Sequence, residues 1–435
     1  MALETFFHQL RETSAVRLYG EVVEANSNYV QSVGPPSSVG DCCEIETEDG
    51  KRHRAEVIGF REQRVLSMPL SIGAGIRYGD RICISSYRAG MPVGGAMLGR
   101  VLDANGLPVD GLSHISAELN LPLDRNAPGP LERVRMTAPL GTGVRAIDAM
   151  LTVARGQRIG LFGGSGVGKS TLLGMMTRNT AADMTVVGLV GERGRELIEF
   201  LEDSLGSEGR ERSVVHVSTS DESPLMRLRC ALAATTTAEY FAAQGKHVLL
   251  ILDSVTRFAM AAREIGLAAG EPPSTKGYPP SVFAKLARLL ERAGNFSRGS
   301  ITGFYTVLME GDDEQDPVVD SARSILDGHI VLSREIADAG FYPPIDVLRS
   351  LSRLMPAVAS APHQEKARAV RRMMSTYAKG EDLIRVGAYK QGADPELDRA
   401  IALRPLFASF LGQGMFEQST MEQAIALLLA LPEMP

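Results

Sequence analysis

A glycine-rich segment at residues 163–171, GGSGVGKST, constrains the fold of this 435-residue chain more than any other feature. It fits the spacing G-x-x-x-x-G-K-[ST], with Gly163, Gly168, Lys169 and Ser170 at the defined positions. The apolar run RIGLF precedes it and a helical pattern follows it, which is the context that a phosphate-binding loop requires. A chance glycine-rich turn rarely carries Lys-Ser in this register. The segment therefore predicts a phosphate-binding turn inside an α/β domain.

The chemistry of such a loop assigns roles to its residues. Successive backbone N–H groups curl around an anion, and the start of the helix adds partial positive charge. We expect Lys169 to reach the β and γ phosphates of a nucleotide such as ATP and Ser170 to supply an oxygen ligand to Mg²⁺. The residues expected to bind the nucleotide here are Gly163, Gly164, Ser165, Gly166, Val167, Gly168, Lys169, Ser170 and Thr171.

Two acidic residues stand at the ends of other apolar runs. Asp253 ends HVLLILD, where a carboxylate can hold the water shell of Mg²⁺ beside Ser170. Glu192 ends TVVGLVGE, where a carboxylate can polarise the water that attacks the γ phosphate. Each also has a plain structural reading, since strands often end in Asp at turns and E-R-x-R-E runs are often exposed helix starts.

The order of patterns along the chain predicts three domains. Short Val-, Ile- and Tyr-rich strands separated by turns predict a small N-terminal β-barrel at residues 1–90. Apolar runs that alternate with helical stretches predict a parallel sheet in an α/β domain at residues 91–346. Beyond about Val347 the strand signals stop, and helical segments predict a C-terminal helical domain at residues 347–435.

Several segments then resemble one protein family as a group. They include GLVGERGRE, LLILDSVTRFA, KGYPPSVFAKL, DPVVDSARSILDGHIVLSRE and YPPIDVLRSLSRLM, and they are similar to the export ATPases of type III secretion systems. That family is related to the catalytic subunit of rotary ATP synthases. The resemblance implies a RecA-like nucleotide domain between a β-barrel and a helical domain, ATP hydrolysis with Mg²⁺, and a homo-hexameric ring. A segment similar to the acidic DELSEED stretch of the synthase subunit is missing from YKQGADPELDRAI, which disfavours proton-driven synthesis.

The resemblance also implies roles for individual residues. In the GER motif it makes Glu192 the catalytic carboxylate and Arg193 its neighbour in the site. It directs Arg292 of the LLER segment toward the γ phosphate. It places Tyr342 against adenine and makes Arg353 an arginine finger that reaches the site of a neighbouring subunit.

The family implies partners and a location as well. These are a stator-like regulator at the N-terminus, a central stalk protein in the ring pore, the export gate, and export substrates with their chaperones. We expect a protein that is cytoplasmic and peripheral at the inner face of the bacterial cytoplasmic membrane. The stripe Leu3, Phe6, Phe7 and Leu10 fits one face of a helix, which could bind the regulator or equally pack on the barrel. The quoted segments look more flagellar than injectisome-like.

Two other functional classes compete with this interpretation. A hexameric RNA translocase similar to Rho also joins a small β domain to a RecA-like ring, but it needs a basic, aromatic-lined path. Here 46 Lys and Arg stand against 52 Asp and Glu, a net charge of −6, and Trp is absent, so we expect no nucleic-acid partner. A ring that binds nucleotide without turnover is opposed by the presence of both Glu192 and Arg353.

Overall fold

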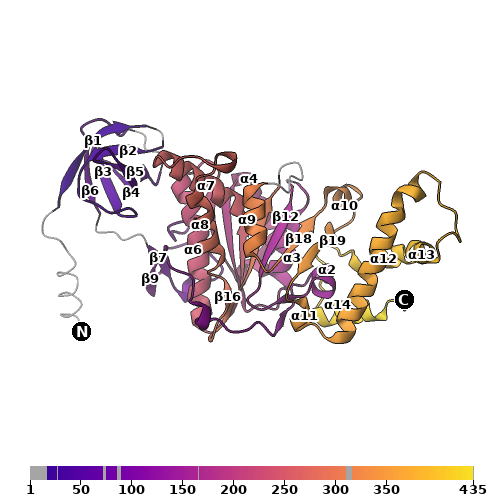
Figure 1. Cartoon of the computed structure of the whole chain (residues 1–435). Coiled ribbons are helices and arrows are strands. Elements are labelled where there is room, and N and C mark those ends of the chain that lie inside the picture. Colours follow the sequence, from indigo (N-terminus) through magenta and orange to yellow (C-terminus); the bar gives the residue numbers. More distant parts are fainter. Residues whose placement is uncertain are drawn as a thin grey trace.

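The computed structural model describes residues 17–26, 28–71, 75–85, 90–164, 166–309 and 316–434. The described chain is elongated, with a barrel at one end, an α/β sheet in the middle and helices at the other end (Figure 1). Among these residues, no helix is long and apolar enough to cross a membrane. The N-terminal stripe and Ser165 lie outside the described residues.

Six antiparallel strands close the barrel in the order β1-β2-β5-β4-β3-β6. Inward-facing residues that alternate along the strands, such as Val22, Ile45 and Val57, form its own small core. The strands are β1 (Tyr19–Ala25), β2 (Val30–Val33), β3 (Cys42–Glu46), β4 (Arg52–Arg61), β5 (Arg64–Pro69) and β6 (Arg81–Ile84).

The central sheet has the strand order β19-β18-β12-β17-β15-β13-β14-β8, and β16 pairs with β17 at its side. The strands from β18 to β8 run parallel, whereas β19 is antiparallel to β18. Their bounds are β8 (Val101–Asp103), β12 (Arg158–Gly163), β13 (Met184–Glu192), β14 (Ser213–Thr219), β15 (His247–Asp253), β16 (Gly294–Asn295), β17 (Ser300–Leu308), β18 (Gly328–Leu332) and β19 (Ile345–Ser352). Two short ladders flank it: β7 (Gly90–Val93) with β9 (Leu119–Pro122), and β10 (Pro139–Leu140) with β11 (Val153–Ala154).

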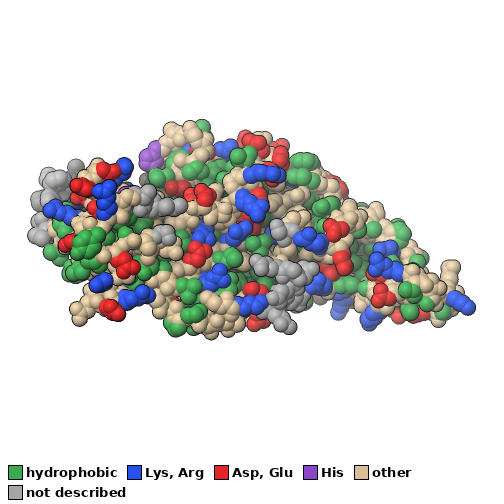
Figure 2. Space-filling view, turned by 90° about the horizontal axis from the view of Figure 1, so that it is seen from above, with side chains coloured by type: hydrophobic (Ala, Val, Ile, Leu, Met, Phe, Trp, Pro, Cys, Tyr) green, Lys and Arg blue, Asp and Glu red, His purple; other side chains and the backbone are tan. Residues whose placement is uncertain are grey.

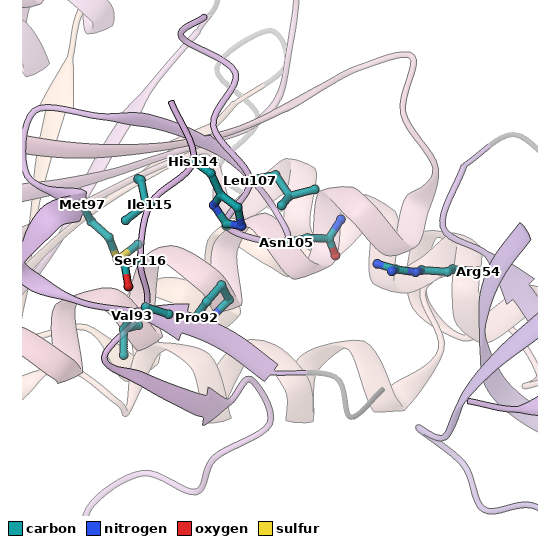
Figure 3. Close-up of a pocket in the computed structure, with 11 residues that line it drawn as sticks. Arg54, Pro92, Val93, Met97, Asn105, Leu107, His114, Ile115 and Ser116 are labelled. Atoms are coloured by element: carbon teal, nitrogen blue, oxygen red, sulfur yellow. The ribbon is translucent and has the colours of Figure 1, made fainter. Parts of the chain in front are cut away.

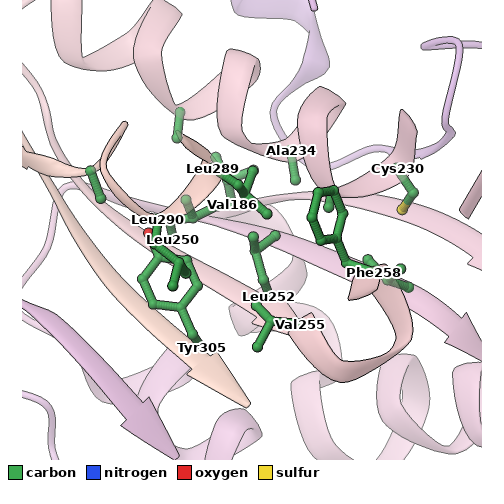
Figure 4. Packing of buried hydrophobic residues seen from close by; sticks show 14 of the residues in the cluster. Val186, Cys230, Ala234, Leu250, Leu252, Val255, Phe258, Leu289, Leu290 and Tyr305 are labelled. Atoms are coloured by element: carbon green, nitrogen blue, oxygen red, sulfur yellow. The ribbon is translucent and has the colours of Figure 1, made fainter. Parts of the chain in front are cut away.

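Helices cover both faces of this sheet (Figure 1). Neighbouring residues of one strand enter different cores: Leu250 packs with Phe258 of α7 on one face, while Leu249 packs with Leu173 of α3 on the other. Figure 4 shows the first of these cores, with Leu250, Phe258 and Leu289 gathered between strands and helices. The helices are α2 (Arg145–Met150), α3 (Lys169–Asn179), α4 (Gly194–Glu199), α5 (Gly206–Glu211), α6 (Pro224–Ala243), α7 (Val255–Ala268), α8 (Pro280–Leu290), α9 (Pro317–Ile325) and α10 (Arg334–Asp338), with a π-helical turn η3 at Phe200–Leu205.

The C-terminal helices are α11 (Met355–Val358), α12 (Ala361–Arg385), α13 (Pro395–Leu411) and α14 (Met421–Ala430). The boundary expected between residues 346 and 347 cuts through β19, which continues to Ser352 because it pairs with β18 along that length. The helical part therefore begins at Met355, later than the sequence indicated. Its apolar residues, among them Val370 and Phe407, share one core with Leu173 of the central domain.

Candidate active site

The phosphate-binding loop leaves the sheet at the carboxyl end of β12 and enters α3 at Lys169. Gly166 and Gly168 have φ of 76° and 88°, in the left-handed region that favours glycine, so the loop turns sharply there. The Lys169 side chain is half-buried, and its ammonium donates a hydrogen bond of 3.1 Å to the Gly164 carbonyl, so it lies folded over the loop. Ser170 is exposed on the first turn of α3. The start of a helix presents backbone N–H groups to an anion, and the Lys169 ammonium lies over the loop that leads into this helix.

Strand order brings the two predicted carboxylates to this edge of the sheet. β17 separates β12 from β15, and β13 follows β15, so the carboxyl ends of the strands that carry Asp253 and Glu192 meet near the loop. Burial raises the pKa of Glu192 to about 8, helped by the neighbouring charge of Asp253 and by a hydrogen bond with Glu196. Burial also raises the pKa of Asp253, against the lowering effect of the Lys169 charge. The three groups therefore act on one another electrostatically, as one site.

Asp253 is held in place by its surroundings. Its side chain is buried and accepts a hydrogen bond of 2.5 Å from the Thr306 hydroxyl on β17. A hydroxyl on Ser170 and a carboxylate on Asp253 are hard oxygen donors of the kind that Mg²⁺ takes. The described residues contain no group of three or more His, Cys, Asp or Glu side chains arranged to hold a metal. The donors present thus fit a Mg²⁺ ion that completes its shell with water and nucleotide oxygens.

Arg257 is a site residue that the sequence interpretation missed. It lies on the first turn of α7, which Ser254 caps through a hydrogen bond to the Arg257 N–H. Its charge opposes the raised pKa of both Glu192 and Asp253 and contributes to the lowered pKa of Lys169, whose main cause is burial. A signal was available: Arg257 follows Asp253 by four residues, about one helical turn, in a helix that starts at the carboxyl edge of the sheet.

Arg292 does not lie at the phosphate loop, and its expected direction toward the γ phosphate is corrected by the structure. Its guanidinium is buried and donates to both Glu239 carboxylate oxygens at 2.7 and 2.9 Å, to the Leu123 carbonyl and to the Thr236 hydroxyl. The physical reason is its place in the chain. The segment after α8 leads into β17, so it ends at the amino edge of the parallel sheet, opposite the loop.

The remaining predicted residues lie at different distances from the loop. Tyr342 lies beside it, since a Cβ on Gly168 would come 3.2 Å from the tyrosine ring. Arg193 is the N-cap residue of α4, next to Glu192, and its exposed side chain donates to Glu196 at 3.4 Å. Arg353 is exposed just after β19, whose last residue pairs with the first residue of β18, so it lies toward the amino edge of its own sheet. One chain therefore does not bring Arg353 to its own phosphate loop.

A well-formed cavity lies elsewhere, between the barrel and the central domain. It has a volume of about 690 Å³, and Figure 3 shows Arg54 on its barrel side and Met97, Asn105 and His114 on the other. It holds none of the groups that converge near Lys169. Chemistry rather than cavity size therefore identifies the active site.

Comparison with known proteins agrees with this geometry. Residues 143–352 match the ATP synthase alpha/beta family, nucleotide-binding domain, and residues 359–430 match the T3SS EscN ATPase C-terminal domain. The flagellum-specific ATP synthase of Salmonella typhimurium is 51% identical over 98% of this chain and 96% of its own length. The assembled ATPase EscN from the type III secretion system of enteropathogenic E. coli has a TM-score of 0.89 at 42% identity, over 95% of this chain and 99% of that one. EscN in complex with its central stalk EscO gives a TM-score of 0.87 at 42% identity, with the same shares covered.

Proposed function

The chain belongs to the family of flagellum-specific ATP synthases and type III secretion ATPases, and from this premise we propose that it hydrolyses ATP to drive protein export through a flagellar secretion apparatus. The observation that supports this most is the convergence of a phosphate-binding loop, the buried Asp253, the half-buried Glu192 and an arginine at one edge of the sheet. Export substrates or their chaperones are unfolded or released at the export gate with the energy of hydrolysis. The higher identity to a flagellar relative than to EscN favours the flagellar system over an injectisome.

The residues of the site divide the chemistry of phosphoryl transfer among them. Backbone N–H groups of the loop and the Lys169 ammonium bind the β and γ phosphates. Glu192 orients and deprotonates the attacking water, and a carboxylate whose pKa is raised toward neutrality suits that role. Arg257 faces the charge that develops on the γ phosphate, the role first expected of Arg292.

Mg²⁺, held through Ser170 and, by way of water, Asp253, neutralises phosphate charge when bound. The Tyr342 ring next to Gly168 offers a flat face to adenine. Arg193, exposed beside Glu192, contacts the phosphates or the adjacent subunit once the ring assembles.

The site is completed by a second copy of the chain in a homo-hexameric ring. Arg353 is exposed and distant from its own loop, as a cation that serves a neighbouring site must be. The assembled state of EscN and its complex with a central stalk support a ring here with a stalk protein in the pore. The regulator at the N-terminus, the export gate and a position on the cytoplasmic face of the membrane complete the proposal.

One pair of variants tests the proposal. Glu192→Gln keeps the shape of the side chain but loses the base, so we expect ATP binding near the wild-type level with turnover reduced by at least about 10²-fold. Lys169→Ala is expected to lose most binding and turnover together. Steady-state phosphate release and ATP affinity, measured on the same preparations, show for each variant whether binding or the chemical step is lost. Turnover that survives in either variant would overturn the site, and stimulation by RNA would favour the translocase alternative.

A further inference from the structure

Glu192 follows a β-bulge that sets its direction. The register between β13 and β14 shifts between Val190 and Glu192, so Gly191 is the extra residue on its strand. Gly191 has φ of 69°, and the Glu192 carbonyl accepts a hydrogen bond of 3.0 Å from the Ser220 N–H just beyond the bulge. Bulges bend a strand and redirect the next side chain. The direction of the Glu192 side chain therefore depends on the residues that pack next to Gly191.

Two arginine side chains lie next to Gly191, on the face where a side chain would project. A Cβ built on it would lie 3.4 Å from Cδ of Arg227, on the first turn of α6, and 3.4 Å from Cβ of Arg257, on the first turn of α7. The aliphatic part of Arg227 and the side chain of Arg257 thus both border the space in which a side chain on Gly191 would lie. Arg257 belongs to the site already described, whereas Arg227 has no role so far.

An ion pair fixes the Arg227 side chain in this place. Its two terminal nitrogens donate to the two carboxylate oxygens of Glu264 on α7, at 3.2 and 2.7 Å, and 13% of the arginine side chain is exposed. A two-point contact of this kind fixes the orientation of the planar guanidinium and therefore of the stem behind it. With its guanidinium engaged by Glu264, the part of Arg227 that faces Gly191 is hydrocarbon.

We propose that Arg227 is a positioning residue for ATP hydrolysis: its stem, fixed by Glu264, holds the Gly191 bulge so that Glu192 points at the attacking water. The inference rests on the proposed function, because it assumes that Glu192 is the base. It assigns Arg227 no contact with the nucleotide. The effect of Arg227 is consequently on the chemical step and not on binding.

The test compares turnover with ATP affinity in the full-length protein. It separates a positioning role of the Arg227 stem from a nucleotide contact and from a role of the ion pair alone. Arg227→Ala is expected to lower kcat by about 10–100-fold, since small misplacements of catalytic groups have effects of that size, while the dissociation constant of a fluorescent ATP analogue changes less than about twofold. Arg227→Lys keeps the hydrocarbon stem without the two-point contact, so it should fall between wild type and the alanine variant. Lys51→Ala, in an exposed barrel pair with Asp49, is the control and should match wild type.

A reciprocal exchange, Arg227→Glu with Glu264→Arg, gives the sharpest outcome. It can restore the ion pair but not the stem beside Gly191, so kcat should stay low. Full recovery of kcat in the exchange would show that only the ion pair matters and would overturn the proposal. Equal losses of affinity and kcat in Arg227→Ala would point instead to a nucleotide contact.

Thermal unfolding of each variant identifies any that fail to fold. If Arg227→Ala does not fold, the kcat and ATP affinity of Arg227→Lys are compared with wild type instead. Wild-type kcat in Arg227→Ala would also refute the inference. If Glu192→Gln retains turnover, the proposed function fails first, and the two failures are thereby distinguished.

Discussion

Replacing Arg292 by Met is expected to weaken the fold and to leave the chemistry of the folded protein intact. The Arg292 side chain is 1% exposed and Glu239 is 12% exposed, so their ion pair is buried. Met fills similar space with no charge and no donors. The change removes hydrogen bonds to Glu239, Leu123 and Thr236 together and leaves a carboxylate inside the protein.

The size of the effect follows from what is left around Glu239. Breaking a buried ion pair by removing one partner costs about 3–5 kcal/mol. Arg125 also contacts the Glu239 carboxylate, at 3.2 Å, but its side chain is 43% exposed, so its compensation is partial. At the lower limit of about 3 kcal/mol, and about 2–4 °C per kcal/mol for a domain of this size, the melting temperature should fall by roughly 6–12 °C.

Differential scanning calorimetry measures this fall, and kcat at 20 °C is measured on the same protein. Arg288→Met, one helical turn earlier on α8, is the matched control because its pair with Asp124 is 3.5 Å long and exposed on both sides. Its melting temperature should change by no more than about 2–4 °C, since an exposed pair contributes at most about 1 kcal/mol. Unchanged stability of Arg292→Met with lost turnover would refute the reasoning and restore Arg292 to the active site.

Three further outcomes are expected. Tyr342→Ala should weaken ATP binding by about tenfold at most, because stacking adds about 0.5–1.5 kcal/mol beyond burial; calorimetric titration measures it, and an unchanged dissociation constant would make Tyr342 a packing residue. Arg353→Ala mixed with Lys169→Ala should regain part of the turnover that each lacks alone, since a mixed ring pairs an intact loop with an intact arginine; no recovery in rings shown by mass to be mixed would contradict a role in trans. Burial raises the pKa of Asp148 from 3.8 to about 7, so between these pH values the native protein keeps a proton that the unfolded chain has released. The free energy of unfolding therefore falls as the pH rises from 3.8 to about 7. Asp148→Asn should therefore gain melting temperature relative to wild type between pH 5 and pH 8, and a difference that does not vary with pH would count against this account.

The barrel and the parallel sheet could be predicted because both rest on local patterns. Alternating apolar residues specify a strand with one buried face, and continuous apolar runs such as VLLILD specify a strand buried on both. The end of the sheet was misjudged at β19, because a strand with partly exposed residues carries a weak signal and Ser352 is held there by its pairing with Gly328. That pairing joins two segments that the sequence does not show to be neighbours.

The sequence by itself determined the phosphate-binding loop, since Gly163 to Thr171 are contiguous and their chemistry needs only the strand before them and the helix after them. It also determined that Glu192 and Asp253 end strands, but only the strand order put them beside Lys169. Which arginine belongs to the site was decided by the tertiary structure, since the spacing from Asp253 to Arg257 gains its meaning from the direction of the strand and helix that carry them. Arg257 lies on the first turn of a helix that starts at the carboxyl edge of the sheet, whereas Arg292 follows a helix that leads back to the amino edge. An arginine at the carboxyl edge acts on Glu192 and Asp253 beside the loop, whereas an arginine at the amino edge is paired with Glu239. The difference arises because the direction of a segment across the sheet is a property of the packed fold.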